Sequence, residues 1–256
     1  MTALIFDCDG VLADTERDGH RVAFNRMFAE FGVPVEWSEE TYGEKLRIAG
    51  GKERMRSVLT DEFVRAAGLP TEPAEQDALI ARWHARKTEI YLDMVTAGDL
   101  PTRPGIRRVI TAAQDADWQI AVASTSAEPS VRAILEQAVG ADSAARVDPV
   151  LAGDVVPAKK PAPDIYLLAL ERLGSRPDRT LVIEDSRNGL LAATGAGLRC
   201  VVTVNGYTEN EPNDEAILVV SSLGDPGGEK TRVIADRNGV RPGDIVTLTD
   251  LSACLS

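Results

Sequence analysis

The sequence predicts a doubly wound α/β fold, in which a mainly parallel sheet is covered by helices and a small helical domain is inserted after the first strand. Three observations predict it. Short apolar runs recur along the chain, segments with helical spacing lie between them, and residues 16–95 keep helical spacing without a convincing strand. We therefore expect an α/β core domain formed by residues 1–15 and 96–256, and a helical cap domain formed by residues 16–95.

The expected strands are short and almost entirely apolar, as is typical of parallel strands buried on both faces. They cover residues 3–6, 120–124, 149–152, 180–184 and 199–204. The expected core helices, recognised by their helical spacing, cover residues 105–117, 128–139, 163–174 and 187–196. Because helices alternate with strands, each helix should be a crossover between parallel strands.

The insert is expected to be helical because apolar residues repeat every three or four positions in it. The repeat is formed by Val22, Phe24, Met27, Phe28 and Phe31 near its start, and by Trp83, Ile90, Tyr91 and Met94 near its end. The last part of the chain, residues 221–256, is rich in Gly, Pro and charge. It predicts irregular structure around one short element.

Composition narrows the partners that the protein can have. With 256 residues the chain can form a full core and an inserted domain. A formal net charge of -12 disfavours nucleic acid or an anionic membrane surface as the main partner, and no apolar run is long enough to span a bilayer. We expect a monomer that binds a small molecule in the cytoplasm, or in the plastid stroma if the chain is processed from a photosynthetic eukaryote.

Cysteine usage is typical of a reducing compartment. The three cysteines, Cys8, Cys200 and Cys254, are too few and too scattered for a disulfide framework. Cys8 stands between two aspartates, where it could be a reactive thiol or, as is more common for free cysteine, a small buried apolar residue.

Two aspartates follow the first expected strand directly. Asp7 and Asp9 project to the same side of an extended segment, and Gly10 lets the chain turn away while leaving room for a substrate. In open α/β sheets ligands bind at the carboxyl ends of the strands, which favours a functional site here. A calcium loop is the alternative, but its twelfth position would need a glutamate and is occupied by Asp18.

Two further groups lie at the same edge of the sheet. Ser124 and Thr125 end the second expected strand, where hydroxyl and backbone N–H groups can hold a phosphate, although taken alone they could be an ordinary helix cap. Lys160 precedes Pro161 and Pro163, which stiffen the chain and fix the lysine. A lysine held near two carboxylates can stabilise both the charged nucleophile and a bound phosphate.

Glu184 and Asp185 add two carboxylates at the end of the fourth expected strand. Four acids cannot share one site unless a cation neutralises them. A hard divalent cation with oxygen ligands, Mg²⁺, resolves this and would recruit a phosphate to an acidic protein. We expect Asp7, Asp9, Glu184 and Asp185 to be its ligands.

Together these groups predict phosphoryl transfer to a carboxylate. Asp7 would attack phosphorus and form an acyl-phosphate, while the metal and Lys160 offset the charge on the transferred group. Asp9 would protonate the departing sugar oxygen and then take a proton from the water that hydrolyses the intermediate.

The four motifs together resemble the haloacid dehalogenase superfamily. Its order of motifs is matched by Asp7-X-Asp9-Gly10, Ser124, Lys160-Pro-Ala-Pro-Asp164 and Glu184-Asp185-Ser186. The segments DCDGVLADTERDGHRVAFN, GGKERM, VASTS, AGDVVPAKKPAPDIY and VIEDSRNGL are similar to its CbbY-like branch, and the likeness covers residues 3–224. The resemblance implies a Rossmann-like core with a small helical cap, and a phosphatase that converts xylulose 1,5-bisphosphate, an inhibitor of the Calvin-cycle enzyme Rubisco, to xylulose 5-phosphate.

The resemblance also implies the role of each residue. Asp7 would be the nucleophile and a metal ligand, and Asp9 the acid/base and a metal ligand through its carbonyl. Glu184 and Asp185 would complete the metal site, and the transferred phosphate would be held by Ser124, Thr125 and Lys160.

The insert is expected to recognise the second phosphate of a bisphosphate. Gly51 permits close approach, and Lys52 or Arg54 can bind the anion, although both could equally form a solvated helix face. Glu16 and His20, on the first helix of the insert, could contact sugar hydroxyls.

Two other functions use the same scaffold. A phosphomutase of the β-phosphoglucomutase type would use the same aspartates but return the phosphoryl group to a sugar. A non-catalytic binding protein would not need Asp7, Asp9, Lys160 and Asp185 intact, and their presence disfavours it.

Overall fold

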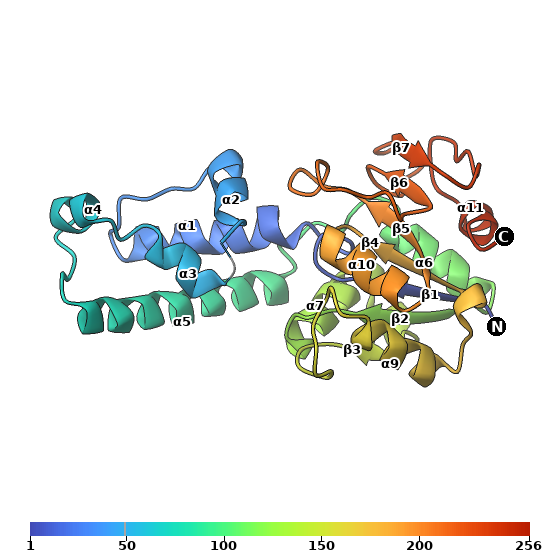
Figure 1. Ribbon diagram of the computed structural model, residues 1–256, viewed down its shortest axis with the longest axis horizontal. Helices are drawn as coiled ribbons and strands as arrows, with labels where there is room; N and C mark the ends of the chain where they lie inside the picture. The colour runs from blue at the N-terminus through green and yellow to red at the C-terminus, as the bar shows by residue number, and fades with distance from the viewer. Residues whose placement is uncertain (49) are drawn as a thin grey trace. The chain divides into compact units, whose positions relative to one another are not determined.

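The chain divides into two compact units in the computed structural model, which describes residues 1–48 and 50–256. One unit, the core unit, is formed by Met1–Asp14 with Leu100–Ser256, and the other, the insert unit, by Thr15–Asp99. The predicted insert, residues 16–95, lies inside the second unit. Figure 1 labels the helices and strands of both units.

The core unit contains a seven-stranded sheet with the strand order β3-β2-β1-β4-β5-β6-β7. The strands are β1 Ala3–Phe6, β2 Gln119–Ala123, β3 Val150–Leu151, β4 Thr180–Glu184, β5 Arg199–Thr203, β6 Leu218–Val220 and β7 Val233–Asp236. Neighbours from β3 to β6 pair in parallel, and β7 pairs with β6 antiparallel. The predicted doubly wound, mainly parallel sheet is confirmed, with all five predicted strands.

Helices follow the strands, as the alternation predicts. Those of the core unit are α6 Ile106–Asp115, α7 Glu128–Val139, α8 Ala141–Ala144, α9 Asp164–Leu173, α10 Arg187–Gly195 and α11 Leu248–Ala253, with a 3₁₀ turn η2 at Pro177–Arg179. On one face, Ile165 of α9 and Leu190 of α10 belong to one buried cluster with Ile5 of β1. The alternate residues of β1, Leu4 and Phe6, are also fully buried, so both faces of this strand are covered.

The end of the chain is more regular than predicted. It holds two short elements, β7 and α11, where the sequence predicted one. A capping box begins α11, in which the Thr247 hydroxyl accepts the Asp250 backbone N–H and the Asp250 carboxylate accepts the Thr247 backbone N–H. The antiparallel strand β7 covers the edge that β6 would otherwise expose.

The insert unit is helical in all its described residues that form regular structure. Its elements are the π-helix η1 Thr15–His20, α1 Arg21–Glu30, α2 Glu39–Lys45, α3 Gly51–Arg56, α4 Asp61–Ala66 and α5 Pro73–Ala97. Helix α1 packs against α5, and Phe28 of α1 meets Trp83 of α5 edge to face with ring centroids 5.7 Å apart. Within the described ranges, none of the helices combines the length and the apolar character that crossing a bilayer requires.

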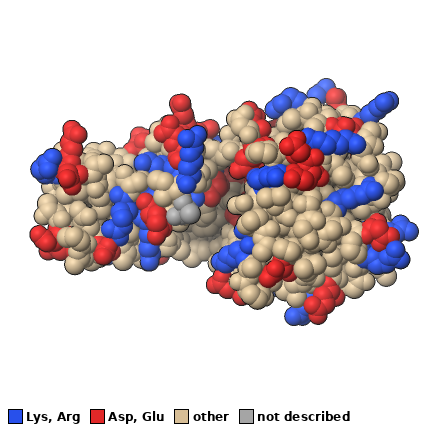
Figure 2. Space-filling view, in the orientation of Figure 1, with Lys and Arg blue, Asp and Glu red and all other residues tan. Residues whose placement is uncertain are grey.

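Charges of both signs are mixed on the face seen in Figure 2, where Lys and Arg alternate with Asp and Glu over each unit. No continuous basic stripe crosses this face.

Candidate active site

Asp7 lies directly after β1, in the middle of the sheet. Its backbone N–H donates to the carbonyl of Ile183 in β4 at 2.9 Å, which continues the pairing of the two strands. The chain then turns at Gly10, which has φ of +75°. A Cβ atom at Gly10 would lie 2.0 Å from Oδ2 of Asp185, so both the turn and the close approach require glycine.

Lys160 lies between two carboxylates from different strands. Its ammonium group donates to Oδ1 of Asp7 at 2.7 Å, to Oε1 of Glu184 at 2.6 Å and to the carbonyl of Ala123 at 3.0 Å. All three protons of the ammonium group therefore have acceptors. Burial disfavours its charge, but Asp7 and Glu184 outweigh this and raise the pKa of Lys160 above its usual range.

Three carboxylates gather beside this lysine. Asp7, Glu184 and Asp185 each offer one oxygen, and these oxygens lie within 4.8 Å of one another. All three residues are buried. Burial and the charges of Glu184 and Asp9 raise the pKa of Asp7 to about 8, although Lys160 acts in the opposite direction. Burial and the charges of Glu184 and Asp7 likewise raise the pKa of Asp185 well above its usual range. One lysine does not neutralise this cluster, and a divalent cation with oxygen ligands fits it.

The second aspartate of the motif, Asp9, faces the serines after β2. Its Oδ2 accepts a hydrogen bond from Ser126 Oγ at 2.5 Å and a longer one from Ser124 Oγ at 3.4 Å. Its carboxylate is thus held apart from the group of three that could hold a metal. The sequence predicted Asp9 as a fourth ligand, and the contact through its main-chain carbonyl that the resemblance implies stays a prediction.

The predicted phosphate-binding residues after β2 differ in exposure. Ser124 is fully buried, and its hydroxyl accepts the backbone N–H of Ser126 at 3.1 Å. Thr125, between them, is exposed. The strand end therefore brings Ser124 to Asp9 and leaves the Thr125 side chain at the surface of the core unit.

Three residues that support the carboxylates were not predicted from the sequence. The Tyr166 hydroxyl donates to Oε1 of Glu184 at 2.5 Å, and Asn205 donates through Nδ2 to Oδ2 of Asp185 at 2.8 Å. A Cβ atom at Gly189 would lie 1.9 Å from the Glu184 carboxyl carbon. Asn205 follows the end of β5, a position that could have identified it, whereas Tyr166 looks like an ordinary apolar residue of a helix.

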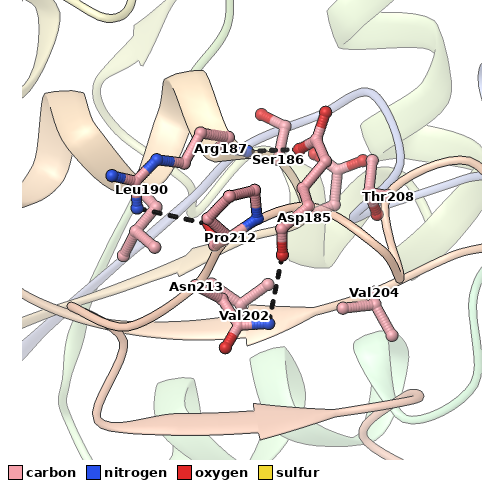
Figure 3. A pocket seen from close by; sticks show the side chains of 10 residues that line it. Asp185, Ser186, Arg187, Leu190, Val202, Val204, Thr208, Pro212 and Asn213 are labelled. Carbon is pink, nitrogen blue, oxygen red and sulfur yellow. Dashed lines mark hydrogen bonds between the residues drawn. The ribbon is translucent and has the colours of Figure 1, made fainter.

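Asp185 also lines a pocket of the core unit, which Figure 3 shows from close by. It is lined by Asp185, Ser186, Arg187, Leu190, Val202, Val204, Thr208, Glu211, Pro212 and Asn213. The Glu211 carboxylate accepts the backbone N–H of Arg187 at 2.6 Å at the start of α10. Because this lining includes neither Asp7 nor Lys160, the pocket is separate from the place where a phosphate would meet Asp7.

Three predicted residues of the insert unit, Glu16, His20 and Arg54, form polar contacts with other residues of that unit. Glu16 accepts a hydrogen bond from the Tyr42 hydroxyl at 2.5 Å, and Arg54 donates to the same hydroxyl at 3.1 Å. His20 Nδ1 lies 2.8 Å from Nζ of Lys87. Burial, followed by the charges of Lys87 and Arg54, holds the pKa of His20 well below its usual range.

Helix α3 carries the other two predicted residues of the insert. Gly51 is its first residue and Lys52, the second, is exposed. A Cβ atom at Gly51 would make only ordinary contact with His84, 3.4 Å away, so packing within the unit does not require a glycine there. Tyr42 and Lys87, which contact the predicted residues, were not predicted from the sequence.

Comparison with known proteins identifies the kind of protein to which this site belongs. A family model described as haloacid dehalogenase-like hydrolase matches residues 1–197. The CBBY-like protein of Arabidopsis thaliana is 44% identical over 229 residues, which cover 90% of this chain and 71% of that protein. The Phosphorylated carbohydrates phosphatase of Thermotoga maritima is 32% identical over 80% of this chain and 85% of its own length.

A solved structure is also similar. The crystal structure of a mutant CbbY from Rhodobacter sphaeroides, in complex with xylulose-(1,5)bisphosphate, has a TM-score of 0.69 and 39% sequence identity, covering 89% of this chain and 97% of that one. The likeness to the CbbY-like branch is therefore confirmed, and so is the predicted enzyme class, a phosphatase. The chain belongs to the haloacid dehalogenase-like hydrolases.

Proposed function

We propose that this protein is a Mg²⁺-dependent sugar-phosphate phosphatase that hydrolyses xylulose 1,5-bisphosphate to xylulose 5-phosphate and phosphate. The observation that carries the proposal is the buried cluster in which Lys160 joins Asp7 and Glu184 beside Asp185. The relative from Thermotoga maritima supports a phosphorylated sugar as the substrate, and the Rhodobacter sphaeroides complex supports the particular bisphosphate.

Asp7 is the nucleophile in this proposal. Its carboxylate attacks the phosphorus of the substrate, the bond from phosphorus to the sugar oxygen breaks, and an aspartyl-phosphate forms. Asp7, Glu184 and Asp185 would hold Mg²⁺, which would supply positive charge to offset that of the phosphoryl group. Lys160 favours the ionised form of Asp7 by donating to it at 2.7 Å, and with Ser124 it binds the transferred group.

Asp9 is the acid/base of the two half-reactions. It gives a proton to the departing sugar oxygen and then takes one from the water that hydrolyses the aspartyl-phosphate. Its hydrogen bonds from Ser126 and Ser124 fix the carboxylate, whereas the Asp7 carboxylate accepts from the ammonium group of Lys160. The two aspartates thus have different surroundings, which is how paired carboxylates divide nucleophilic and acid/base roles.

The insert unit acts as a cap that selects the substrate. A bisphosphate carries a second phosphate that the core residues do not bind, and Lys52 and Arg54 supply cationic groups on α3. Glu16 and Arg54 share the Tyr42 hydroxyl, which holds them in one arrangement. Glu16 and His20 offer hydrogen-bonding groups to the sugar hydroxyls, and Gly51, without a side chain, permits close approach to the start of α3.

A phosphate-release assay tests the proposal. The purified protein is incubated with Mg²⁺ and a panel of pentose and hexose mono- and bisphosphates, including xylulose and ribulose 1,5-bisphosphate. We expect phosphate release, with the highest kcat/KM for xylulose 1,5-bisphosphate. Conversion of a sugar phosphate to its isomer without net phosphate release would instead identify a mutase.

Substitution of the nucleophile tests the mechanism. We expect Asp7→Asn and Asp9→Asn each to lower kcat by about 10³-fold or more, because each removes a group that acts at the reacting bond. Asp154→Asn is the control, since Asp154 is an exposed aspartate of the same unit that pairs with exposed Lys159. Beryllium fluoride should bind against Asp7 in a crystal, and turnover by Asp7→Asn at the wild-type rate would exclude the aspartyl-phosphate.

A further inference from the structure

Arg103 is a buried arginine in the segment by which the chain re-enters the core unit at Leu100. Its guanidinium group donates to four backbone carbonyls. These are the carbonyls of Thr203 at 2.8 Å, Val204 at 2.7 Å and Ser221 at 2.7 Å, together with that of Gly10. One side chain therefore joins the turn after β1 to the ends of β5 and β6.

The arrangement requires an arginine. A buried cation is costly unless polar partners surround it, and here carbonyl oxygens do so, with the Asp14 carboxylate 3.6 Å from Nε. The planar guanidinium group directs its N–H groups to several acceptors at fixed angles. A lysine has three protons on one nitrogen, so it cannot replace a group that donates to these acceptors from two nitrogens, Nη1 and Nη2.

Three of the four carbonyls that Arg103 holds, those of Gly10, Thr203 and Val204, belong to the two segments that flank Asp185. Gly10 lies so close that an added Cβ atom would be 2.0 Å from Oδ2 of Asp185. Asn205, which directly follows Val204, donates to the same oxygen at 2.8 Å. Arg103 thus fixes both neighbours of one carboxylate of the candidate metal site.

Arg103 also lies where the two connecting segments of the core unit meet. Its backbone N–H donates to the carbonyl of Leu12 at 3.0 Å, and Ala13 pairs with Thr102 in an antiparallel bridge. Asp14, the last residue before the insert, is its acidic partner. The Arg103 side chain therefore connects the segments that lead into and out of the insert with Gly10 and Val204, which lie in the segments beside Asp185.

We propose that Arg103 is a positioning residue of the metal site, which holds Gly10 and Asn205 against Asp185 and so sets the affinity for Mg²⁺. The inference rests on the proposed Mg²⁺ site, but it assigns a role to a residue that contacts neither the metal nor the substrate. Residues that orient metal ligands in this way change metal affinity by about 10- to 100-fold when they are replaced.

Calorimetric titration of the metal-free protein with MgCl₂ tests the inference without turnover. The variants are Arg103→Lys, which keeps the charge, and Arg103→Met, which removes it. We expect each to raise the Kd for Mg²⁺ by about tenfold or more. The kcat of these variants should recover in part at high Mg²⁺, while KM for the sugar phosphate changes less than about twofold.

Arg108→Met is the matched control. Arg108 also donates to backbone carbonyls of the core unit, those of Val246, Leu223 and Gly224 at 2.9, 2.8 and 2.6 Å, but it holds no segment beside Asp185. We expect this variant to lower the melting temperature and to keep the wild-type Kd for Mg²⁺ within about twofold. This result would show that removing an arginine that binds backbone carbonyls lowers stability without lowering Mg²⁺ affinity, so a loss of Mg²⁺ affinity would be specific to Arg103.

Asn205→Ala supplies a second measurement, because it removes the hydrogen bond to Asp185 directly. Its effect on the Kd should not add to that of Arg103→Lys, since both act through the same carboxylate. Unchanged Mg²⁺ affinity in Arg103→Lys would overturn the inference, whatever happens to Arg103→Met. A wild-type protein that binds Mg²⁺ but hydrolyses no sugar phosphate would overturn the proposed function alone, and one that binds no Mg²⁺ would overturn both.

Discussion

Gly189 shows how closely the site is packed at the scale of single residues. It lies in α10, and a Cβ atom there would overlap the carboxyl group of Glu184 at 1.9 Å. We expect Gly189→Ala to displace Glu184, to weaken Mg²⁺ binding by about tenfold or more, and to lower the free energy of unfolding by about 1–3 kcal/mol. Urea unfolding and Mg²⁺ titration measure the two effects.

Gly195→Ala is the control in the same helix. A Cβ atom there would meet only Pro163, at an ordinary contact distance of 3.5 Å. This variant should keep wild-type Mg²⁺ affinity and unfold with an equal or higher free energy, because alanine favours the helix over glycine by about 1 kcal/mol. Equal Mg²⁺ affinity in both variants would show that Gly189 does not shape the site.

The sequence identifies those site residues that directly follow strands. Asp7 follows β1, Ser124 follows β2, and Glu184 with Asp185 stands at the end of β4. Because parallel strands bring their carboxyl ends to one edge, these residues can be grouped before any coordinates are known. Tyr166 and Arg103 could not be found in this way, since their partners are fixed only by how helices and connecting segments pack.

At the scale of elements, α3 of the insert unit carries the proposed anion-binding residue. We expect Lys52→Ala to raise KM for xylulose 1,5-bisphosphate by about tenfold, because it removes a cation that pairs with the second phosphate. The kcat should change little, since the reacting phosphate is bound by the core unit. Steady-state phosphate release with the bisphosphate and with a monophosphate measures the difference.

Arg56→Ala on the same helix is the control. Arg56 is exposed and already paired with Asp77 at 2.5 Å, so it is not expected to bind the substrate. An equal rise in KM for both variants would indicate a general effect of charge rather than a phosphate site at Lys52. A tenfold rise in KM for a monophosphate in Lys52→Ala would also contradict the recognition of a second phosphate by Lys52.

The elements differ in how well their sequences predict them. The five predicted strands are apolar and buried, and the pattern alone identifies them. Strand β6 is only three residues long, and β7 is partly exposed within a segment rich in glycine and charge. Strand β7 is defined by its pairing with β6, because its own short sequence stands between the charged residues Arg232 and Arg237.

At the scale of the whole molecule, the acidic cluster links stability to pH and to Mg²⁺. In the folded metal-free protein burial raises the pKa of Asp7 to about 8, whereas an unfolded aspartate has a pKa near 3.9. The folded state therefore binds more protons in this range, and its stability falls as pH rises. His20, whose pKa is lowered in the folded state, acts in the opposite direction only below about pH 6.5.

We therefore expect the metal-free protein to lose up to about 1 kcal/mol of unfolding free energy between pH 7 and pH 8. Saturating Mg²⁺ should remove this loss, because the metal binds the ionised carboxylates and replaces their protons. Urea unfolding at both pH values, in EDTA and in Mg²⁺, measures the effect. Asp7→Asn in EDTA should show a smaller loss, and equal stability of the metal-free wild type at both pH values would contradict the prediction.

The interruption of the core unit by the insert has a consequence for the order in which the sheet can assemble during synthesis. Strand β1 leaves the ribosome first, but its two neighbours are β2, which begins at Gln119, and β4, which begins at Thr180. The nascent β1, apolar on every residue, must wait for both neighbours, and pairings this distant along the chain form slowly. The insert unit, whose elements are all local, can fold meanwhile, so the first-made strand is among the last to reach its place.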